Sequence, residues 1–413
     1  MTDDNSTEPA LVQRGPWLTV PDLKSVLVVA HTLVYAQRLR EVVSLVESDL
    51  RVQVFFTVAP HAFGDGVNRY LEDQGISVLP WEHAVRTTFD LAIAAGSRGI
   101  HRLRAPVIRM PHGGGNIKVL RASEGMTAET AGVPSSLTRR YLTHEGRVVP
   151  AVLALSHQRD LQILERSCPE ALPVARVVGD PCYDRVLASV PHRARYRAAL
   201  GLTEAERLLF VSFTWGPTSS FGGLDALLPR LLGELPPDVR IALTAHPNIY
   251  AAHSRWQVRR WLGPALGNRI HLVPPEVGWQ GPLLAADWTI GDSGSVTMYG
   301  TLTGRPILLA RHTTQEVAPD SVAARLAATA PAVSPHRPLR EQLAYAEETH
   351  RPAEHRRIAR QLSSRPGAFH RLMRGLLYRS LGLAEPAHPT EVRLVPPPTP
   401  MHSWYASETE AAA

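Results

Sequence analysis

Lysine and cysteine are nearly absent from this chain of 413 residues. Lysine occurs only at positions 24 and 118, so arginine carries almost all the positive charge behind the formal net charge of +6. This bias is typical of GC-rich codon usage, and the sequence has no basic-aromatic motif of an RNA- or DNA-binding module, so we expect no nucleic-acid partner. The two cysteines, Cys168 and Cys182, are too few for a disulfide framework or a four-cysteine zinc site.

Long apolar runs are missing as well. No stretch approaches the roughly 20 apolar residues of a membrane span, and the first ten residues, MTDDNSTEPA, are acidic and polar rather than a signal peptide. We therefore expect a cytoplasmic protein that at most lies at the inner face of the membrane. The chain also has no Gly-Lys-Ser/Thr of a P-loop, no Asp-x-Asp and no His/Cys/Asp cluster with ligand spacing. We therefore expect no metal and no tightly bound cofactor.

The length favours two domains over one, and a hydrophobic content of 44% suits a globular protein with a sizeable core. Short runs that are apolar on both faces alternate with helical stretches, which predicts parallel sheets covered by helices on both sides. The series restarts near residue 200, so we expect an α/β protein with two Rossmann-like domains facing across a cleft. The expected strands are Ser25–Ala30, Val52–Val58, Ile76–Leu79, Leu91–Ala95, Pro106–Met110, Val152–Ser156, Arg176–Val178, Leu208–Phe213, Arg240–Ala245, Ile270–Val273, Trp288–Ile290 and Ile307–Ala310.

The chain divides into five expected segments. Residues 1–21 form a flexible N-terminus, 22–190 the first Rossmann-like domain and 191–345 the second. Arginine-rich terminal helices follow over 346–383, and a proline-rich tail over 384–413 is expected to be disordered.

Polar or glycine-rich residues follow many of the expected strands. In open parallel sheets, ligands bind beyond the carboxyl ends of the strands, so these positions are the candidate site. A single histidine at a strand end is more often a hydrogen-bonded bystander, but two in facing domains favour a site. The candidates are His31, Gly96, His112, Gly113 and Gly114 in the first half, and Thr214, Trp215, His246, Asp292, Ser293, Gly294 and Ser295 in the second.

Residues 285–310, AADWTIGDSGSVTMYGTLTGRPILLA, form the most informative stretch. A strand ends at a small, hydroxyl-rich turn, Asp292–Ser295, and a helix follows. The start of a helix leaves backbone N–H groups unpaired, which suits a phosphate. The alternative is an ordinary helix start at which Ser293 or Ser295 only caps the first turn.

Five short motifs resemble, in order, those of the CDP-glycerol glycerophosphotransferase family, the teichoic-acid polymerases and primases. They lie over residues 105–310 and read MPHGGGNIK, VVGDPCYDRVL, VSFTWGP, LTAHPNI and ADWTIGDSGSVTMYGTLTGRPIL. The resemblance implies a GT-B-like pair of domains, an N-terminal acceptor domain and a C-terminal domain for a nucleotide-diphosphate donor. It also implies that the family's two loop histidines correspond to His112 and His246, its phosphate-binding serine to Ser295, and the aspartate of its Gly-x-Pro-Arg-x-Asp segment to Asp184.

The sequence departs from the family at several of these positions. Ser293 stands where the family has tyrosine, Gly294 where it has serine, and Cys182 where it has arginine. Asp292-Ser293-Gly294 also resembles the Asp-Ser-Gly-Gly segment of UDP-N-acetylglucosamine 2-epimerases. Those enzymes have acidic residues just after this turn, whereas residues 296–299 here supply none.

Transfer of a glycerophosphate, polyol phosphate or sugar to an acceptor hydroxyl requires a base and donors for the diphosphate. We expect His112 to be the base, His246 to contact the transferring or leaving phosphate, and Ser293 and Ser295 to hold the diphosphate. Gly113 and Gly114 would let the backbone approach the substrate closely, or would form a plain flexible turn.

The arginine-rich region 350–383 has two interpretations. Its last part, Phe369–Tyr378, is amphipathic and could contact an anionic membrane surface that carries a lipid-linked acceptor. The alternative is a terminal helix that packs on the first domain with a solvated basic face. Two functional classes also stay open, a nucleotide-dependent transferase acting on a cell-envelope acceptor and a non-catalytic nucleotide- or partner-binding protein of the same fold.

Overall fold

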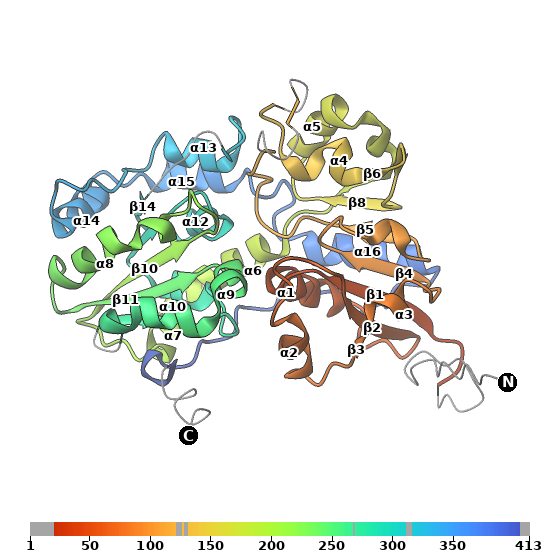
Figure 1. Ribbon diagram of the computed structural model, residues 1–413, viewed down its shortest axis with the longest axis horizontal. Coiled ribbons are helices and arrows are strands. Elements are labelled where there is room, and N and C mark those ends of the chain that lie inside the picture. Colours follow the sequence, from red (N-terminus) through yellow and green to blue (C-terminus); the bar gives the residue numbers. More distant parts are fainter. Residues whose placement is uncertain (1–19, 121–125, 128–130, 267–268, 311–315, 405–413) are drawn as a thin grey trace.

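The computed structural model describes residues 20–120, 126–127, 131–266, 269–310 and 316–404. Figure 1 shows two lobes side by side, each built on a sheet with helices around it, and the helix α6 (Pro181–Ser189) lies between them. The expected flexible segment 1–21 falls almost wholly outside the described residues.

The N-terminal domain contains a seven-stranded sheet in the order β3-β2-β1-β4-β5-β8-β9, in which every paired strand is parallel. A small antiparallel hairpin, β6–β7, stands apart from it. The elements are β1 (Lys24–Ala30), α1 (Leu33–Val43), β2 (Val52–Val58), α2 (Val67–Glu72), β3 (Val78–Leu79), α3 (Trp81–Ala84), β4 (Leu91–Ala94), β5 (Val107–Arg109), α4 (Arg139–Leu142), β6 (Thr143–His144), β7 (Arg147–Val148), β8 (Val152–Leu155), α5 (Arg159–Ser167) and β9 (Ala175–Val177).

The C-terminal domain contains a five-stranded parallel sheet in the order β12-β11-β10-β13-β14. The elements after α6 are α7 (Arg193–Ala199), β10 (Arg207–Phe213), α8 (Leu224–Gly233), β11 (Val239–Ala245), α9 (Pro247–His253), α10 (Arg255–Leu262), β12 (Ile270–Leu272), α11 (Gln280–Ala285), β13 (Trp288–Gly291), α12 (Ser295–Gly300), β14 (Ile307–Leu309), α13 (Val322–Ala327), α14 (Leu339–Glu348), α15 (Pro352–Ala359) and α16 (Phe369–Leu381).

The fold class expected from the sequence is confirmed. Each strand of the two parallel sheets begins and ends within two residues of its predicted limits. The central strands β1 and β10 are buried over almost their whole length, as strands covered on both faces must be. The hairpin β6–β7 was not predicted, because strands of two residues carry no periodic signal.

The terminal helices do not form the separate basic unit expected over 346–383. The apolar side of α15 packs in the core of the C-terminal domain, whereas α16 crosses back and buries Phe369, Met373 and Leu377 in the core of the N-terminal domain. Figure 1 shows α16, in blue, lying among the strands and helices of the first lobe. The apolar face that membrane contact would have used is therefore inside the protein, and the interpretation of a terminal helix packed on the first domain describes this helix correctly.

The expectation of a disordered tail is wrong for residues 384–404. Val395, Met401 and Trp404 are buried in the core of the C-terminal domain. The backbone N–H of Val395 donates to Ser189 Oγ at 2.9 Å, and the hydroxyl of Tyr196 donates to the Val395 carbonyl at 2.7 Å. Composition suggested disorder because prolines are dense here, but apolar residues spaced between them anchor the segment. Residues 405–413 lie outside the described part of the chain.

Asp180 connects both domains to the linker helix. It caps the start of α6 by accepting from the backbone N–H of Tyr183 at 2.7 Å. Its carboxylate also accepts from the guanidinium of Arg38 on α1 at 2.5 Å and from the hydroxyl of Tyr299 on α12 at 3.0 Å. The aspartate is fully buried and the side chain of Arg38 is 5% exposed, so one buried carboxylate joins α1, α6 and α12.

We expect Asp180→Ala to lower the free energy of unfolding by about 3–5 kcal/mol, because Arg38 would be left as an unpaired buried charge. Tyr299→Phe removes a single hydrogen bond to a charged group and should cost about 1.5–3 kcal/mol. Urea unfolding of both variants measures the difference. Equal, small effects would show that Asp180 does not carry the connection between the domains.

Candidate functional site

The glycine-rich loop after β5 reaches across to the C-terminal domain. A β-carbon on Gly113 would lie 2.6 Å from Ser295 Oγ, and one on Gly114 would lie 3.0 Å from the ring of Tyr299. The loop then pairs with the C-terminal domain, since Ala318 donates its N–H to the Ile117 carbonyl at 2.8 Å. The close approach predicted for Gly113 and Gly114 is therefore made to the start of α12. A phosphate placed there requires the loop or the domains to move apart.

His112 follows β5 on the N-terminal side of the cleft and is exposed to solvent on one side. Its ring stacks on Tyr35 with the centroids 4.3 Å apart. Desolvation and the nearby cations Arg109 and Arg38 lower the pKa of His112, against a hydrogen bond to the Ala95 carbonyl. A neutral imidazole that donates one N–H to a carbonyl has a lone pair on its other nitrogen. His112 is thus neutral and able to accept a proton.

His246 faces the same space from the other domain, at the end of β11. Its Nδ1 accepts from the backbone N–H of Asn248 at 3.1 Å, so it caps the start of α9. Burial, Lys118 and His112 all lower the pKa of His246. A neutral imidazole whose Nδ1 accepts must carry its proton on Nε2. His246 therefore offers a donor to the cleft, whereas His112 offers an acceptor.

The turn Asp292–Ser295 is held by its aspartate. Asp292 is 2% exposed, and it accepts from the backbone N–H groups of Thr214 at 2.9 Å and Gly294 at 3.0 Å. Asp292 thus joins the loop after β13 to the backbone of the loop after β10. Gly294 is the N-cap of α12, and no side chain caps that helix.

The capping alternative for Ser293 and Ser295 is therefore not what the structure shows. Both serines are half-buried and follow the strand end. Because α12 is only six residues long, its dipole contributes little, and any phosphate affinity at this turn must come from side-chain and backbone donors.

The predicted Trp215 has two neighbours that the sequence reasoning missed, Phe63 and Lys118. Phe63 of the N-terminal domain contacts Trp215 of the C-terminal domain with ring centroids 4.8 Å apart, and Trp215 lies 6.2 Å from His246. The ammonium of Lys118 lies 5.0 Å from the Trp215 ring centroid, and Lys118 lowers the pKa of both cleft histidines. The scarcity of lysine, together with the place of Lys118 six residues after His112, was the signal that could have identified it.

Two other predicted residues lie beside the site. His31 is 1% exposed, and its Nε2 donates to the Arg98 carbonyl at 2.7 Å. Gly96 packs against it, since a β-carbon there would lie 2.8 Å from the Tyr35 ring and 3.0 Å from His31 Nδ1. His31 and Gly96 therefore support Tyr35, which in turn stacks on His112.

Asp184 ties α6 to the start of α16. Its two carboxylate oxygens accept from the backbone N–H groups of Gly367 at 2.7 Å and Phe369 at 3.0 Å. Burial raises the pKa of Asp184 to about 6 despite these bonds. These contacts are structural, and the place in the cleft carried over from the family motif stays a prediction.

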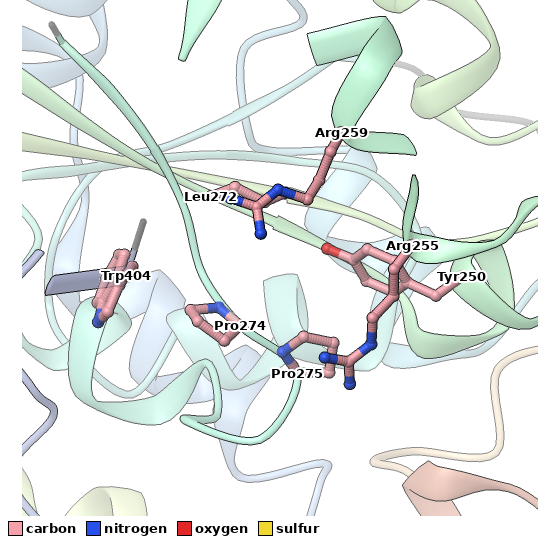
Figure 2. A pocket seen from close by; sticks show the side chains of 7 residues that line it. All are labelled: Tyr250, Arg255, Arg259, Leu272, Pro274, Pro275 and Trp404. Atoms are coloured by element: carbon pink, nitrogen blue, oxygen red, sulfur yellow. The ribbon is translucent and has the colours of Figure 1, made fainter. Parts of the chain in front are cut away.

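A groove leads from this region to the surface. It has a volume of about 620 Å³ and runs between Phe63, Arg69 and Asp73 of the N-terminal domain and Pro247 and Tyr250 of the C-terminal domain. A smaller pocket of about 30 Å³ adjoins it and is lined by Tyr250, Arg255, Arg259, Leu272, Pro274, Pro275 and Trp404 (Figure 2). The small pocket has room for about one water molecule, so the groove is the larger opening beside the cleft.

In the described part of the chain, no three His, Cys, Asp or Glu side chains gather as metal ligands would. Within the same residues, none of the helices combines the length and hydropathy that crossing a bilayer demands.

The fold is similar to that of several solved structures at low sequence identity. A variant of the wall teichoic acid polymerase TagF superposes with a TM-score of 0.58 at 13% identity, covering 88% of this chain and 90% of that one. A putative UDP-N-acetylglucosamine 2-epimerase from Listeria monocytogenes gives a TM-score of 0.52 at 12% identity, covering 89% of this chain and 100% of that one. The UDP-GlcNAc 2-epimerase of Methanocaldococcus jannaschii gives 0.50 at 13% identity, covering 86% and 99%.

These likenesses establish the GT-B-like architecture of two facing Rossmann-like domains. No protein-family model matches the sequence, and no curated protein matches it significantly. Polymerase and epimerase structures are similar to the chain to nearly the same degree, so the reaction has to be argued from the site.

Buried neutral histidines make stability depend on pH. Burial lowers the pKa of His31, His355 and His370 to about 4, below the 6.5 of an unfolded chain. Because the folded state holds the neutral form, their contribution is complete above pH 6.5 and is lost as the pH falls towards 4. We expect the Tm to fall between pH 7 and pH 5, with each histidine contributing roughly 1–2 kcal/mol.

Thermal unfolding at half-unit pH steps measures this fall. His370→Gln should have a shallower pH dependence than the natural protein, because it removes one of the three buried histidines. An identical slope for His370→Gln would refute the explanation.

Proposed function

We propose that the protein is a nucleotide-dependent transferase. It moves a glycerophosphate, a polyol phosphate or a sugar from a nucleotide-diphosphate donor to a hydroxyl group of a cell-envelope acceptor. Its place of action is the cytoplasm or the inner face of the membrane. The observation that carries the proposal is the meeting, across the cleft, of one histidine that accepts a proton and one that donates a hydrogen bond. The likeness to TagF, one variant of which was soaked with CDPG, supports the choice of donor class.

The donor phosphates bind on the C-terminal side. His246 Nε2–H and the hydroxyls of Ser293 and Ser295 are the donors, and Lys118 supplies positive charge from the loop of the other domain. Hydrogen bonds to charged oxygens are about twice as strong as neutral ones, and the diphosphate needs no metal to be held in this way. Trp215 and its loop line the donor side of the cleft.

The acceptor hydroxyl is deprotonated by His112. One ring nitrogen is taken by the Ala95 carbonyl and the other keeps a free lone pair, and the proton affinity of the ring rises when an anionic donor occupies the cleft. The acceptor oxygen attacks the phosphorus that bears the polyol, or the anomeric carbon of a sugar. The bond to the nucleotide breaks, and a nucleoside monophosphate leaves in the first case and a nucleoside diphosphate in the second.

Two alternatives remain in different classes. An epimerase similar to the UDP-N-acetylglucosamine 2-epimerases would need acidic groups after the turn, but Thr297, Met298 and Tyr299 of α12 are buried and carry no carboxylate. A non-catalytic nucleotide-binding protein would bind a donor without turning it over. Incubation with CDP-, UDP- and GDP-linked donors, followed by analysis of released nucleotides, separates the three. A thermal-shift screen with the same compounds identifies which nucleobase the donor carries.

Ser295→Ala should weaken donor binding by about 1.5–3 kcal/mol, the value of one hydrogen bond to a charged group. Calorimetric titration of the donor identified in the screen measures the loss. The matched control is Ser220→Ala on the other side of Asp292, which should bind the donor normally. If Ser295→Ala kept full affinity and turnover, the phosphate role of this turn would have to be abandoned.

His112→Ala should lower turnover by about 10²–10⁴-fold and keep donor affinity, because it removes a general base. His246→Ala should weaken donor binding and turnover together, since it removes a donor to phosphate. Steady-state kinetics and donor titration on both variants test this. Normal turnover in His112→Ala would show that His112 is not the general base. If His112→Ala lost donor affinity and His246→Ala kept it, the two histidines would have each other's roles.

A further inference from the structure

Arg109 is a buried cation of the N-terminal domain, close enough to His112 to lower the pKa of that histidine. It is the last residue of β5, directly before the glycine-rich loop, and it is 4% exposed. Its backbone pairs with β4 and β8 on either side, which fixes its position in the middle of the sheet.

Its guanidinium has no anionic partner among the described residues. Nε has no hydrogen-bond partner, and the charged or titratable groups that act on Arg109 are the phenols of Tyr35 and Tyr141. On the cleft side, its positive charge lowers the pKa of His31 and of His112. No carboxylate is part of this surrounding.

The other buried arginines are paired. Arg38 is held by Asp180, and Arg374, at 7% exposed, donates to Glu385 at 2.7 Å. A buried charge without a partner is costly and is rare in structural positions. The unpaired guanidinium of Arg109 is explained if a bound anion pairs with it during function.

We propose that Arg109, with the hydroxyls of Tyr35 and Tyr141, forms a binding subsite for an anionic group of the acceptor, a phosphate or a carboxylate, next to His112. The subsite lies on the N-terminal face, opposite the turn that holds the donor. The description of the ligand as the acceptor rests on the proposed function, whereas the anion site itself does not. The acceptor is therefore a hydroxyl compound that carries its own negative charge close to the reacting hydroxyl.

The geometry assigns a specificity role to this residue. A planar guanidinium can donate two parallel hydrogen bonds to a phosphate or a carboxylate, in a bidentate contact. A neutral polyol would leave the charge uncompensated and would bind weakly. Because Tyr35 stacks on His112, an anion on Arg109 and Tyr35 would also fix the position of the base.

Thermal unfolding with three probes tests the subsite without any need for activity. sn-Glycerol 3-phosphate, glycerate and glycerol share a hydroxylated skeleton and differ in charge. We expect a rise in Tm of roughly 2–5 °C with one or both anions and none with glycerol. A response to the phosphate alone identifies a phosphate ligand, and a response to both anions identifies a general anion site.

Arg109→Met should unfold at a higher temperature than the natural protein without ligand, because it removes an unpaired buried charge, and should lose the response to anions. Arg374→Met is the matched control and should unfold at a lower temperature, because it breaks a paired charge. Arg109→Lys should keep part of the response. Ser295→Ala should keep all of it, which separates this site from the donor turn.

The proposal is overturned if Arg109→Met responds to the anions as the natural protein does, or if it loses as much stability as Arg374→Met. Nucleotide donors are titrated against Arg109→Met in the same experiment. Failure of every nucleotide to bind even the natural protein would refute the proposed function while leaving the anion result standing.

Discussion

The buried carboxylate of Asp180 is the constraint on which the relative position of the two domains depends. It accepts from Arg38 of the first domain and Tyr299 of the second while capping the helix that joins them. Arg38 also donates to the Pro111 carbonyl at 3.3 Å, directly before His112. Tyr299 stands four residues after Ser295 on α12 and contacts Gly114. The same interaction therefore holds the loop of His112 and the turn of Ser295, so the contact between the domains and the candidate site share residues.

The chemistry of the cleft follows from hydrogen bonds made outside it. The Ala95 carbonyl and the Asn248 N–H each occupy one nitrogen of a histidine, and this leaves an acceptor on His112 and a donor on His246. Burial lowers the pKa of both rings and keeps them neutral; Lys118 adds to this effect at both histidines and Arg109 at His112. With Gly113 packed on Ser295, the described conformation is closed. Under the proposed function, the domains would have to open to admit a donor; a groove lined by Phe63 and Pro247 lies between them.

Much of the fold could be predicted from the sequence because its signals are local. Runs that are apolar on both faces, such as Val52–Val58, form strands covered by helices on both sides in an α/β protein. Residues that follow parallel strands, such as His112 and His246, lie at the carboxyl edge of their sheets. What the sequence could not show depends on distant partners. The carboxylates of Asp184 and Asp292 accept from backbone N–H groups contributed by other segments. The tail around Val395 and the missing partner of Arg109 are likewise visible only once the chain is folded.

The most direct measurement is a crystal structure of the protein with CDP and, in a separate crystal, with UDP. The proposed transfer predicts that the diphosphate lies within hydrogen-bond distance of Ser295 Oγ and His246 Nε2, with Gly113 moved away from Ser295. The nucleotide base should then lie on the C-terminal domain, and His112 should face the phosphates from across the cleft. A nucleotide bound elsewhere, with the contact between Gly113 and Ser295 intact, would contradict the proposed donor site and the transferase built on it.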